Sequence, residues 1–196
     1  MMNRLLFSGA SLFFLLTAFQ SKAMAIDMSL SSPSANLGDK VDVELDISGL
    51  GNGIAPSVSA FDVDVTFDPS VISFDSVTFG NQLSLNSTPL FQDGIVTGSG
   101  ILNLAEISDD TPTDLNDLQA PDFTLATISF NTVSTGSSNL GISLNDLGDA
   151  AGDPLTVDNF NAGTVTVAVP FGVSTNMGIM ILAGICGVNY LRKKSA

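Results

Sequence analysis

The segment AFDVDVTFDPSVISF, residues 60–74, decides the fold class of this chain because apolar and polar residues alternate along it. Its odd positions from Phe61 to Phe67 are apolar, and the even positions between them are Asp62, Asp64 and Thr66. Successive side chains of a β-strand point to opposite faces, so this pattern predicts a strand with one buried and one solvated face. A register shift of one residue would bury the carboxylates, which fixes the orientation of the strand.

The same alternation recurs on both sides of this segment. Residues 41–47 repeat it, and the further candidate strands are 26–30, 71–79, 94–107, 123–133, 139–144 and 163–169. Turn residues separate them at 37–39, 49–56, 68–69, 93–94 and 148–154. Many short strands with almost no helical periodicity predict two packed antiparallel sheets. One helical turn is expected over 113–119, with Thr113 as its N-cap.

Acidic residues dominate the charge, with 20 Asp and Glu against six Lys and Arg. Lys40 is the only base between Ile26 and Val169, whereas all 20 acids lie there, so this stretch has a formal charge of −19. Such a body repels phosphate backbones, which excludes nucleic acid as a partner, and it attracts cations.

The residue types also restrict the chemistry. The chain has no histidine and a single cysteine, Cys186, so Ser–His–Asp and Cys–His arrangements and His-ligated zinc are excluded. Glu44 and Glu106 are the only glutamates, and Glu44 falls on the solvated face of a predicted strand. We therefore expect no enzymatic activity; a polysaccharide-cleaving carboxyl pair is the alternative that these two residues would have to supply.

Calcium is the one candidate cofactor, although none is required. Oxygen ligands gather in one loop, at Asp109, Asp110, Asp114, Asn116 and Asp117, and a second loop holds Asp146, Asp149 and Asp153. Calcium takes six to eight oxygen ligands, but neither loop follows the EF-hand order. The alternative is that these acids are simply solvated, with Asp114 and Asp117 favoured by a helix N-terminus.

Residues 1–25 have the three parts of a secretory signal peptide. Arg4 precedes the apolar stretch 5–19, and Ala23-Met24-Ala25 provides a small-x-small cleavage pattern. The export machinery is therefore expected to produce a mature chain beginning at Ile26. The alternative is an uncleaved membrane anchor, for which the apolar stretch is short.

The segment 169–196 is expected to reach the membrane. Val169-Pro170-Phe171-Gly172 leads into residues 177–191, which are apolar apart from Asn189, and Arg192, Lys193 and Lys194 follow at once. The stretch is long enough for a transmembrane helix, and the basic cluster places the acidic body outside the cell. The alternative is a last strand or helix of the soluble domain, against which the abrupt change to three bases argues.

This layout resembles the PEP-CTERM class of bacterial sorting signals, in which a short Val-Pro-Glu-Pro-type motif, an apolar helix and a basic cluster end the chain. Phe171-Gly172 stands where that class has Glu-Pro. The resemblance implies processing at residues 169–172 by an exosortase-type sorting enzyme.

The body is similar to cohesin-like domains. Residues 36–43, 60–74, 125–130 and 163–167 match their strand and turn pattern, and the similarity spans 26–168. The resemblance implies an all-β, nine-stranded jelly-roll sandwich, related in shape to some carbohydrate-binding modules. Cohesins proper bind dockerin modules.

These features divide the chain into a signal peptide (1–25), a cohesin-like β-sandwich (26–168) and a sorting segment with a membrane helix and basic tail (169–196). The expected function is a non-enzymatic binding or structural module at the cell envelope or in the extracellular matrix, which binds another protein through an exposed sheet face. The alternative is binding of exopolysaccharide. Residues 26–169 contain no Trp or Tyr, the usual stacking platforms for sugars.

Overall fold

The computed structural model describes residues 25–170. The expectations for residues 1–24 and 171–196, including the membrane helix and the basic cluster, lie outside this range. The described elements are β1 (Asp27–Leu30), β2 (Ser34–Asn36), β3 (Lys40–Ser48), β4 (Val58–Thr66), β5 (Ile72–Phe79), β6 (Phe91–Gly98), β7 (Ile101–Ile107), α1 (Pro112–Leu118), β8 (Phe123–Thr132), β9 (Gly136–Asp149), β10 (Asn159–Asn161) and β11 (Gly163–Ala168).

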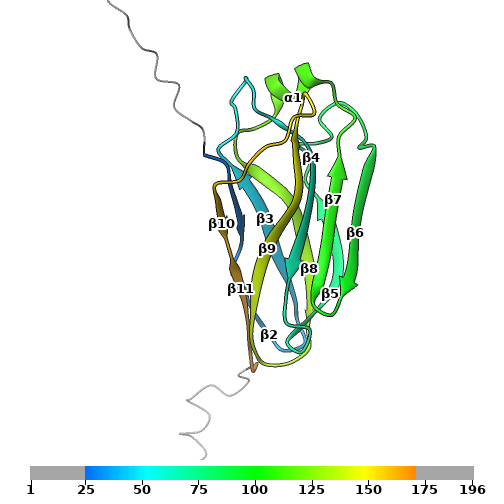
Figure 1. Cartoon of the computed structure of the whole chain (residues 1–196). Helices are drawn as coiled ribbons and strands as arrows, with labels where there is room; N and C mark the ends of the chain where they lie inside the picture. Colours follow the sequence, from blue (N-terminus) through cyan, green and yellow to red (C-terminus); the bar gives the residue numbers. More distant parts are fainter. Residues whose placement is uncertain (1–24, 171–196) are drawn as a thin grey trace, which may run out of the picture.

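Two sheets pack face to face (Figure 1). One has the order β10-β1-β3-β8-β5, and the other has the order β2-β11-β9-β4-β7-β6. Most neighbouring strands are antiparallel, but β1 pairs with β10 and β11 pairs with β2 in parallel. The described chain enters at one end of the sandwich and leaves at the opposite end, after β11 (Figure 1). The predicted all-β jelly-roll sandwich is confirmed.

The core lies between the sheets and follows the predicted alternation. The apolar odd positions of β3 and β4 are buried, and Val43, Leu45, Val63 and Val65 have no exposed surface. Aromatic rings join the layers, since Phe67 on one side lies 5.2 Å from Phe130 of β8 between ring centroids. Burial of this apolar surface stabilises the sandwich, because each fully buried aliphatic side chain contributes roughly 1.5–3 kcal/mol.

The predicted strands and turns differ from the structure in three details. Residues 94–107, predicted as one strand, form the hairpin β6–β7, which turns at Ser99-Gly100. The predicted turn at Asp93-Gly94 lies inside β6. The glycine at position 94 has another cause, since a Cβ there would stand 2.5 Å from Val77 Cγ1 of the opposite sheet. Glycine is needed there for close packing between the sheets. The short strands β2 and β10 were not predicted, so the described residues form eleven strands rather than about nine.

The helix also begins earlier than predicted. Thr111, not Thr113, is the N-cap, and its hydroxyl accepts a hydrogen bond from the backbone nitrogen of Asp114 at 3.2 Å. Pro112 follows the cap at the first helical position, where a missing N–H costs nothing. The short helix covers one end of the sandwich, beside the start of β4 (Figure 1).

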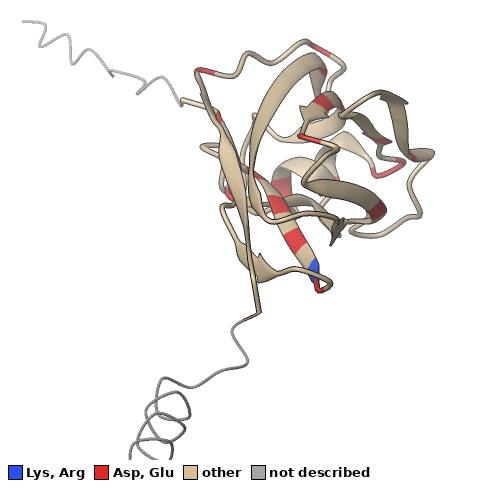
Figure 2. Cartoon of the chain, turned by 90° about the horizontal axis from the view of Figure 1, so that it is seen from below, with Lys and Arg blue, Asp and Glu red and all other residues tan. Residues whose placement is uncertain are grey.

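Acidic residues are spread over both sheets and the loops, and Lys40 is the only cation among residues 25–170 (Figure 2). Lys40 pairs with Asp75 at 2.6 Å, and this hydrogen-bonded ion pair, with Asn131, lowers the pKa of Asp75. The rest of the described surface is strongly negative. Among the described residues, no helix is long and apolar enough to cross a membrane.

Candidate functional site

The outer faces of the two sheets differ in polarity. On the five-stranded sheet, the outward positions of β3 are Asp42, Glu44 and Asp46, and they pair in register with Ser129, Thr127 and Thr124 of β8. The hydroxyl of Thr124 donates to Asp46 Oδ1 at 2.6 Å, and that of Ser129 donates to Asp42 Oδ1. Two of the three acids on β3 are thus hydrogen-bonded to β8, and these two central strands present no large apolar side chain outward.

The outer face of the six-stranded sheet carries exposed apolar residues on β6 and β7. The register aligns its outward residues in three rows that cross β6, β7, β4 and β9: Phe91–Ile107–Ala60–Gly148, Asp93–Ala105–Asp62–Asp146, and Ile95–Asn103–Asp64–Ser143. We call the first three members of the first row, Ala60, Phe91 and Ile107, the apolar corner. We call the acids of the second row, Asp62, Asp93 and Asp146, the acid row.

The apolar corner is open to solvent. Phe91 is 46% exposed and Ile107 is 43% exposed, and they are neighbours on adjacent strands. Leu90, 67% exposed, precedes them and is held by a 2.8 Å hydrogen bond from its backbone nitrogen to the Ile107 carbonyl. Clustered exposed apolar side chains on a monomer typically mark an interaction surface.

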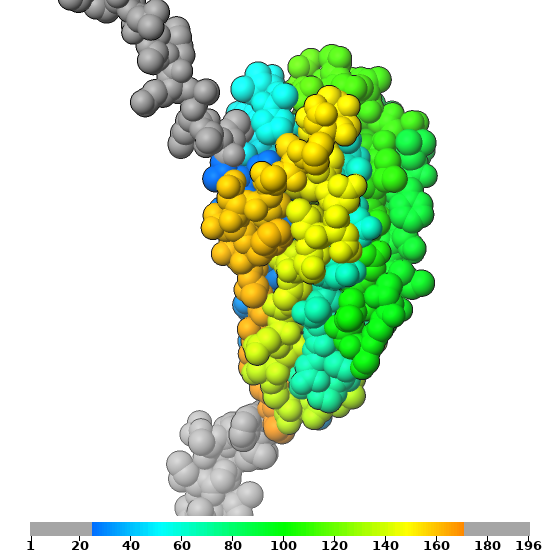
Figure 3. Space-filling view, in the orientation of Figure 1, coloured from blue at the N-terminus to red at the C-terminus, as the bar shows by residue number. Residues whose placement is uncertain are grey.

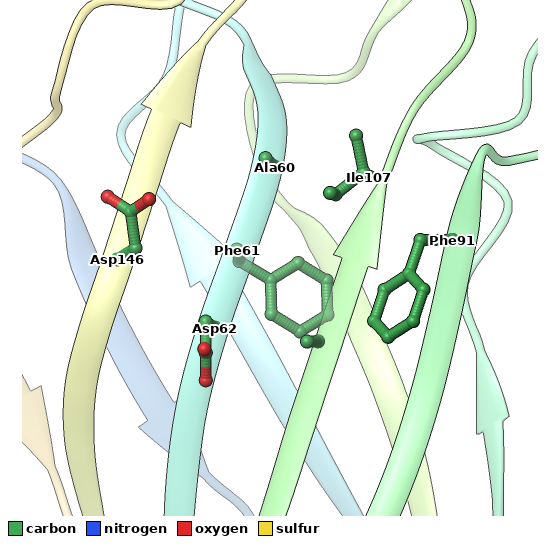
Figure 4. A pocket seen from close by; sticks show the side chains of 7 residues that line it. Ala60, Phe61, Asp62, Phe91, Ile107 and Asp146 are labelled. Atoms are coloured by element: carbon green, nitrogen blue, oxygen red, sulfur yellow. The ribbon is translucent and has the colours of Figure 1, made fainter.

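A depression of about 210 Å³ lies between the apolar corner and the acid row. Its lining includes Phe61, which is almost fully buried and packs 6.2 Å from Phe79 of the other sheet. Figure 4 shows Phe91, Ile107 and Phe61 gathered on one side, with the carboxylates of Asp62 and Asp146 on the other. In the space-filling view, this part of the molecule faces the reader, between the yellow β9 and the green β6 (Figure 3).

Side-chain amides fix the acids beside the depression. Asn103 Nδ2 donates to Asp62 Oδ1 at 2.6 Å and to Asp64 Oδ1 at 2.9 Å, and Asn145 Nδ2 donates to Asp62 Oδ1 at 3.1 Å. Asp62 Oδ2 and the Asp146 carboxylate have no such donor among the described side chains. The register breaks between Asp62 and Val63, which places Asp146 directly opposite Asp62. The site can therefore accept hydrogen bonds or cationic groups next to an apolar surface.

Glu106 lies beneath this site and was not predicted to be buried. It has the inward parity of Leu102 and Leu104, and none of its surface is exposed. Gln92 Nε2 donates to its Oε1 at 2.7 Å, whereas Oε2 is buried without a hydrogen-bond partner. Burial raises the pKa of Glu106 to about 7, and the hydrogen bond from Gln92 opposes the shift.

The two glutamates do not form a catalytic pair. Glu44 lies on the outer face of the five-stranded sheet, whereas Glu106 faces the core from β7 of the other sheet. A glycosidase needs two carboxyls flanking one cleft. This arrangement gives the carboxyl-pair alternative no structural support.

The structure directs the predicted calcium ligands to different partners. The Asp110 carboxylate accepts bonds from the backbone nitrogens of Leu85 and Asn86 and from the Ser87 hydroxyl; burial opposes these bonds, but together they lower its pKa. Asp114 accepts from the Thr111 hydroxyl, and Asn116 Oδ1 accepts from Ser57. Asp109 and Asp117 do not join the other predicted ligands around a common point. The described residues contain no group of three acids placed to hold a metal. Calcium binding stays a prediction.

The second predicted acidic loop is not a single loop, because Asp146 and Asp149 lie in β9 and only Asp153 follows that strand. Asp149 Oδ1 accepts hydrogen bonds from the backbone nitrogens of Ala151 at 2.8 Å and Asp153 at 2.9 Å. This side chain therefore shapes the turn after β9.

Only parts of the two processing sites fall in the described range. Ala25 is exposed and Ile26 is 4% exposed, whereas Ala23 lies outside. Val169 and Pro170 are exposed directly after β11, whereas Phe171, Gly172, Arg192, Lys193 and Lys194 lie outside. The cleavage and sorting sites stay predictions.

The chain is a two-sheet β-sandwich whose six-stranded sheet carries the apolar corner on its outer face. The cohesin domain family matches residues 26–167, so the chain belongs to the cohesin family. This membership supports the prediction that the chain is not an enzyme, because cohesin domains are protein-interaction modules. The comparison with curated proteins found no match.

Solved cohesin structures share the fold. The sixth cohesin of scaffoldin B from Acetivibrio cellulolyticus, solved with a dockerin, is 21% identical, with a TM-score of 0.60 over 73% of this chain and 99% of that one. CaCohA2 from Clostridium acetobutylicum is 21% identical, with a TM-score of 0.59 over 74% of this chain and 91% of that one. A non-cellulosomal cohesin from the archaeon Archaeoglobus fulgidus is 18% identical, with a TM-score of 0.55 over 80% and 96%.

Proposed function

We propose that this cohesin-family chain is an exported, non-enzymatic module that binds a protein partner through the outer face of its six-stranded sheet. The observation that carries the proposal is the contrast between the two outer faces: β3 and β8 of one present polar residues, and the other places an apolar corner beside a row of acids. The dockerin bound by the Acetivibrio cohesin makes a dockerin-like module the first partner class to test.

The charge of the face limits the partner. Asp62 and Asp146 line the depression, and Asp93 lies in the same row across the sheet. The described body has one base, which is paired on the opposite sheet. A second copy of this chain would bring like charges together, which costs several kcal/mol across an interface. The face therefore fits a partner with an apolar side chain for the corner and Lys or Arg groups around it.

Export and sorting complete the proposal. The family match begins at residue 26, and Ile26 is the first buried residue of the described chain, so the fold accommodates a mature start there. Val169 and Pro170 are accessible to a sorting enzyme at the opposite end. The start of β6 and the end of β7, which carry Phe91 and Ile107, lie toward the α1 end of the sandwich, away from the end of β11 (Figure 1). A membrane tail would thus hold the binding face outward.

Site-specific photo-crosslinking tests the binding face directly. A photoreactive residue would be placed at Phe91, and a control at Thr127 on the other face, in the full chain expressed in an exporting bacterium. The proposal expects one protein to crosslink at position 91 and not at 127. Once purified, that protein should bind the wild-type chain and lose at least about tenfold in affinity with Ile107→Asp, the loss typical of an interface hot spot. Thr127→Asp should bind as the wild type does.

Two results would contradict this function. Equal binding by Ile107→Asp and Thr127→Asp would show that the six-stranded face is not the interface. Specific binding of a polysaccharide, lost with Asp62→Ala and without any crosslinked protein, would favour the carbohydrate alternative.

A further inference from the structure

Glu106 is the only charged residue that the described fold buries completely. Its strand, β7, is paired on one side with β4 and on the other with the edge strand β6. Ala105 and Ile107 flank Glu106 along β7, and both line the depression on the outer side of the sheet. Gln92, which donates a hydrogen bond to Glu106, follows Phe91 along β6. One pair of strand segments therefore carries the binding site on its outer side and this carboxyl on its inner side.

Apart from Gln92, the neighbours of Glu106 on β4 and on the facing sheet are apolar. Phe61 is its register partner on β4, and Phe61 packs against Phe79 of the facing sheet. On the β6 side, the backbone at Gly94 lies close to Val77 of β5. An ionised carboxylate among these groups would have one hydrogen bond and no counter-ion, which is strongly unfavourable.

No charged group of the neighbouring elements offers compensation. Asp62 on β4 and Asp93 on β6 occupy outward positions, and on β5 Asp75 is paired with Lys40 on the far side of the other sheet. In the loop after β7, the Asp110 carboxylate is held by backbone nitrogens of residues 85 and 86. The neutral carboxylic acid is therefore the form that suits the closed sheet.

We propose that Glu106 is a proton-operated latch: its neutral form keeps β6 paired with β7 beneath the apolar corner, and its ionisation opens this edge. The effect of this opening on partner affinity rests on the proposed function, whereas the opening of β6 from β7 does not depend on it. Opening exposes the carboxyl to water and so relieves the cost of its charge. Because Phe91 and Ile107 sit on the two strands that separate, opening also dismantles the apolar corner.

The direction with pH follows from the two states. In the closed state the pKa of Glu106 is raised to about 7, whereas in the open state it returns toward the ordinary 4.5. The closed form thus binds the proton more tightly, so opening is favoured as pH rises from about 4.5 to about 7 and levels off above. The full effect on the opening equilibrium is on the order of 300-fold. The sequence has no histidine, so no His titration overlaps this window.

Hydrogen exchange of the purified full chain tests the latch without a partner. Exchange of the peptides that cover 91–98 and 101–107 would be compared between the wild type, Glu106→Gln and the matched control Glu44→Gln, whose side chain is exposed on the other sheet. At about pH 8, opening of the wild type and of Glu44→Gln should exceed that of Glu106→Gln by tenfold or more, and at about pH 4.5 all three should agree. Gln92→Ala removes a bond that lowers the pKa of Glu106 in the closed state, so opening should increase further at high pH and level off above about pH 7.

Equal exchange in wild type and Glu106→Gln at both pH values would overturn the latch, as would a difference that is the same at both. A partner identified by crosslinking should bind the wild type more weakly at about pH 8 than Glu106→Gln does. If the two bind equally there while their exchange differs, the link to binding is wrong. Failure to find any partner would count against the proposed function, and the exchange result would still decide the latch.

Discussion

The backbone nitrogen of Ile26 donates a 3.0 Å hydrogen bond to Asp158 Oδ2, and the backbone nitrogen of Asp158 donates back to the Ile26 carbonyl at 2.7 Å. These bonds tie the start of the sandwich to the residues that precede β10. Cleavage after Ala25 would turn the Ile26 amide into an ammonium group at the same position. The hydrogen bond to Asp158 would then become a charge-assisted ion pair.

The first prediction concerns this pair in a chain that begins at Ile26. Asp158→Asn should lower the free energy of unfolding by about 0.5–1 kcal/mol near neutral pH, the range for a solvent-exposed ion pair. The difference should fade above about pH 8, as the ammonium loses its proton. Chemical unfolding of both chains measures it. In a chain that retains residues 1–25, the same substitution should lack this pH dependence, and an identical profile in both contexts would refute the pair.

The second prediction concerns Gln119, which follows α1 and is 3% exposed. Its side chain replaces a strand partner, because Oε1 accepts from Val58 N at 2.7 Å and Nε2 donates to the carbonyls of Val58 and Gln82 at 2.9 and 3.0 Å. Gln119→Leu should cost about 2–4 kcal/mol, since it leaves buried backbone groups of Val58 unpaired. Leu118→Ala, at a 57% exposed position, should stay within about 0.5 kcal/mol. Similar losses in the two variants would disprove the bridging role.

The sandwich itself was predictable because burial in β3 and β4 depends on alternation alone. The alternation from Val41 to Ile47 and from Phe61 to Phe67 leaves one apolar face and one acidic face, and packing two such sheets together buries the first and solvates the second. The hairpin β6–β7 was not predicted because a glycine can mark either a turn or a close contact between sheets, and the sequence alone does not tell them apart. Gly94 allows close packing against Val77, and Gly100, with φ of 74°, makes the turn.

The site was harder to predict than the fold. The apolar corner depends on which residue of β6 stands opposite Ile107, and that register is set by an irregularity between Val96 and Gly98 that no short motif announces. The parity of Leu102, Leu104 and Glu106 did carry a signal for a buried carboxyl. Acids are almost never fully buried unpaired, so that signal conflicts with the usual rule.

The third prediction compares two glycines, one needed for its positive φ alone and one needed also because a Cβ would clash. Gly100 and Gly152 both have positive φ, 74° and 85°, but a Cβ at Gly100 would stand 2.3 Å from the Phe67 carbonyl oxygen, whereas nothing lies within 4 Å at Gly152. Both Ala variants should lose about 1 kcal/mol from the left-handed backbone. Gly100→Ala should lose at least about 1 kcal/mol more, because the backbone must move. Equal shifts in the urea midpoint would contradict the clash.

The last prediction concerns the acid row and the partner that crosslinking identifies. Asp146→Lys and Asp42→Lys change the net charge equally, but Asp146 lies beside the apolar corner and Asp42 lies on the opposite face. Because a cationic partner is steered by the local field, Asp146→Lys should slow association by about three- to tenfold at low ionic strength, and Asp42→Lys should have a smaller effect. Added salt should shrink the difference, since the exposed charges are screened within about 10 Å at 0.1 M. Stopped-flow association at several salt concentrations measures both. Equal slowing would mean that overall charge governs the encounter, and no salt dependence in the wild type would mean that the partner at this face is uncharged.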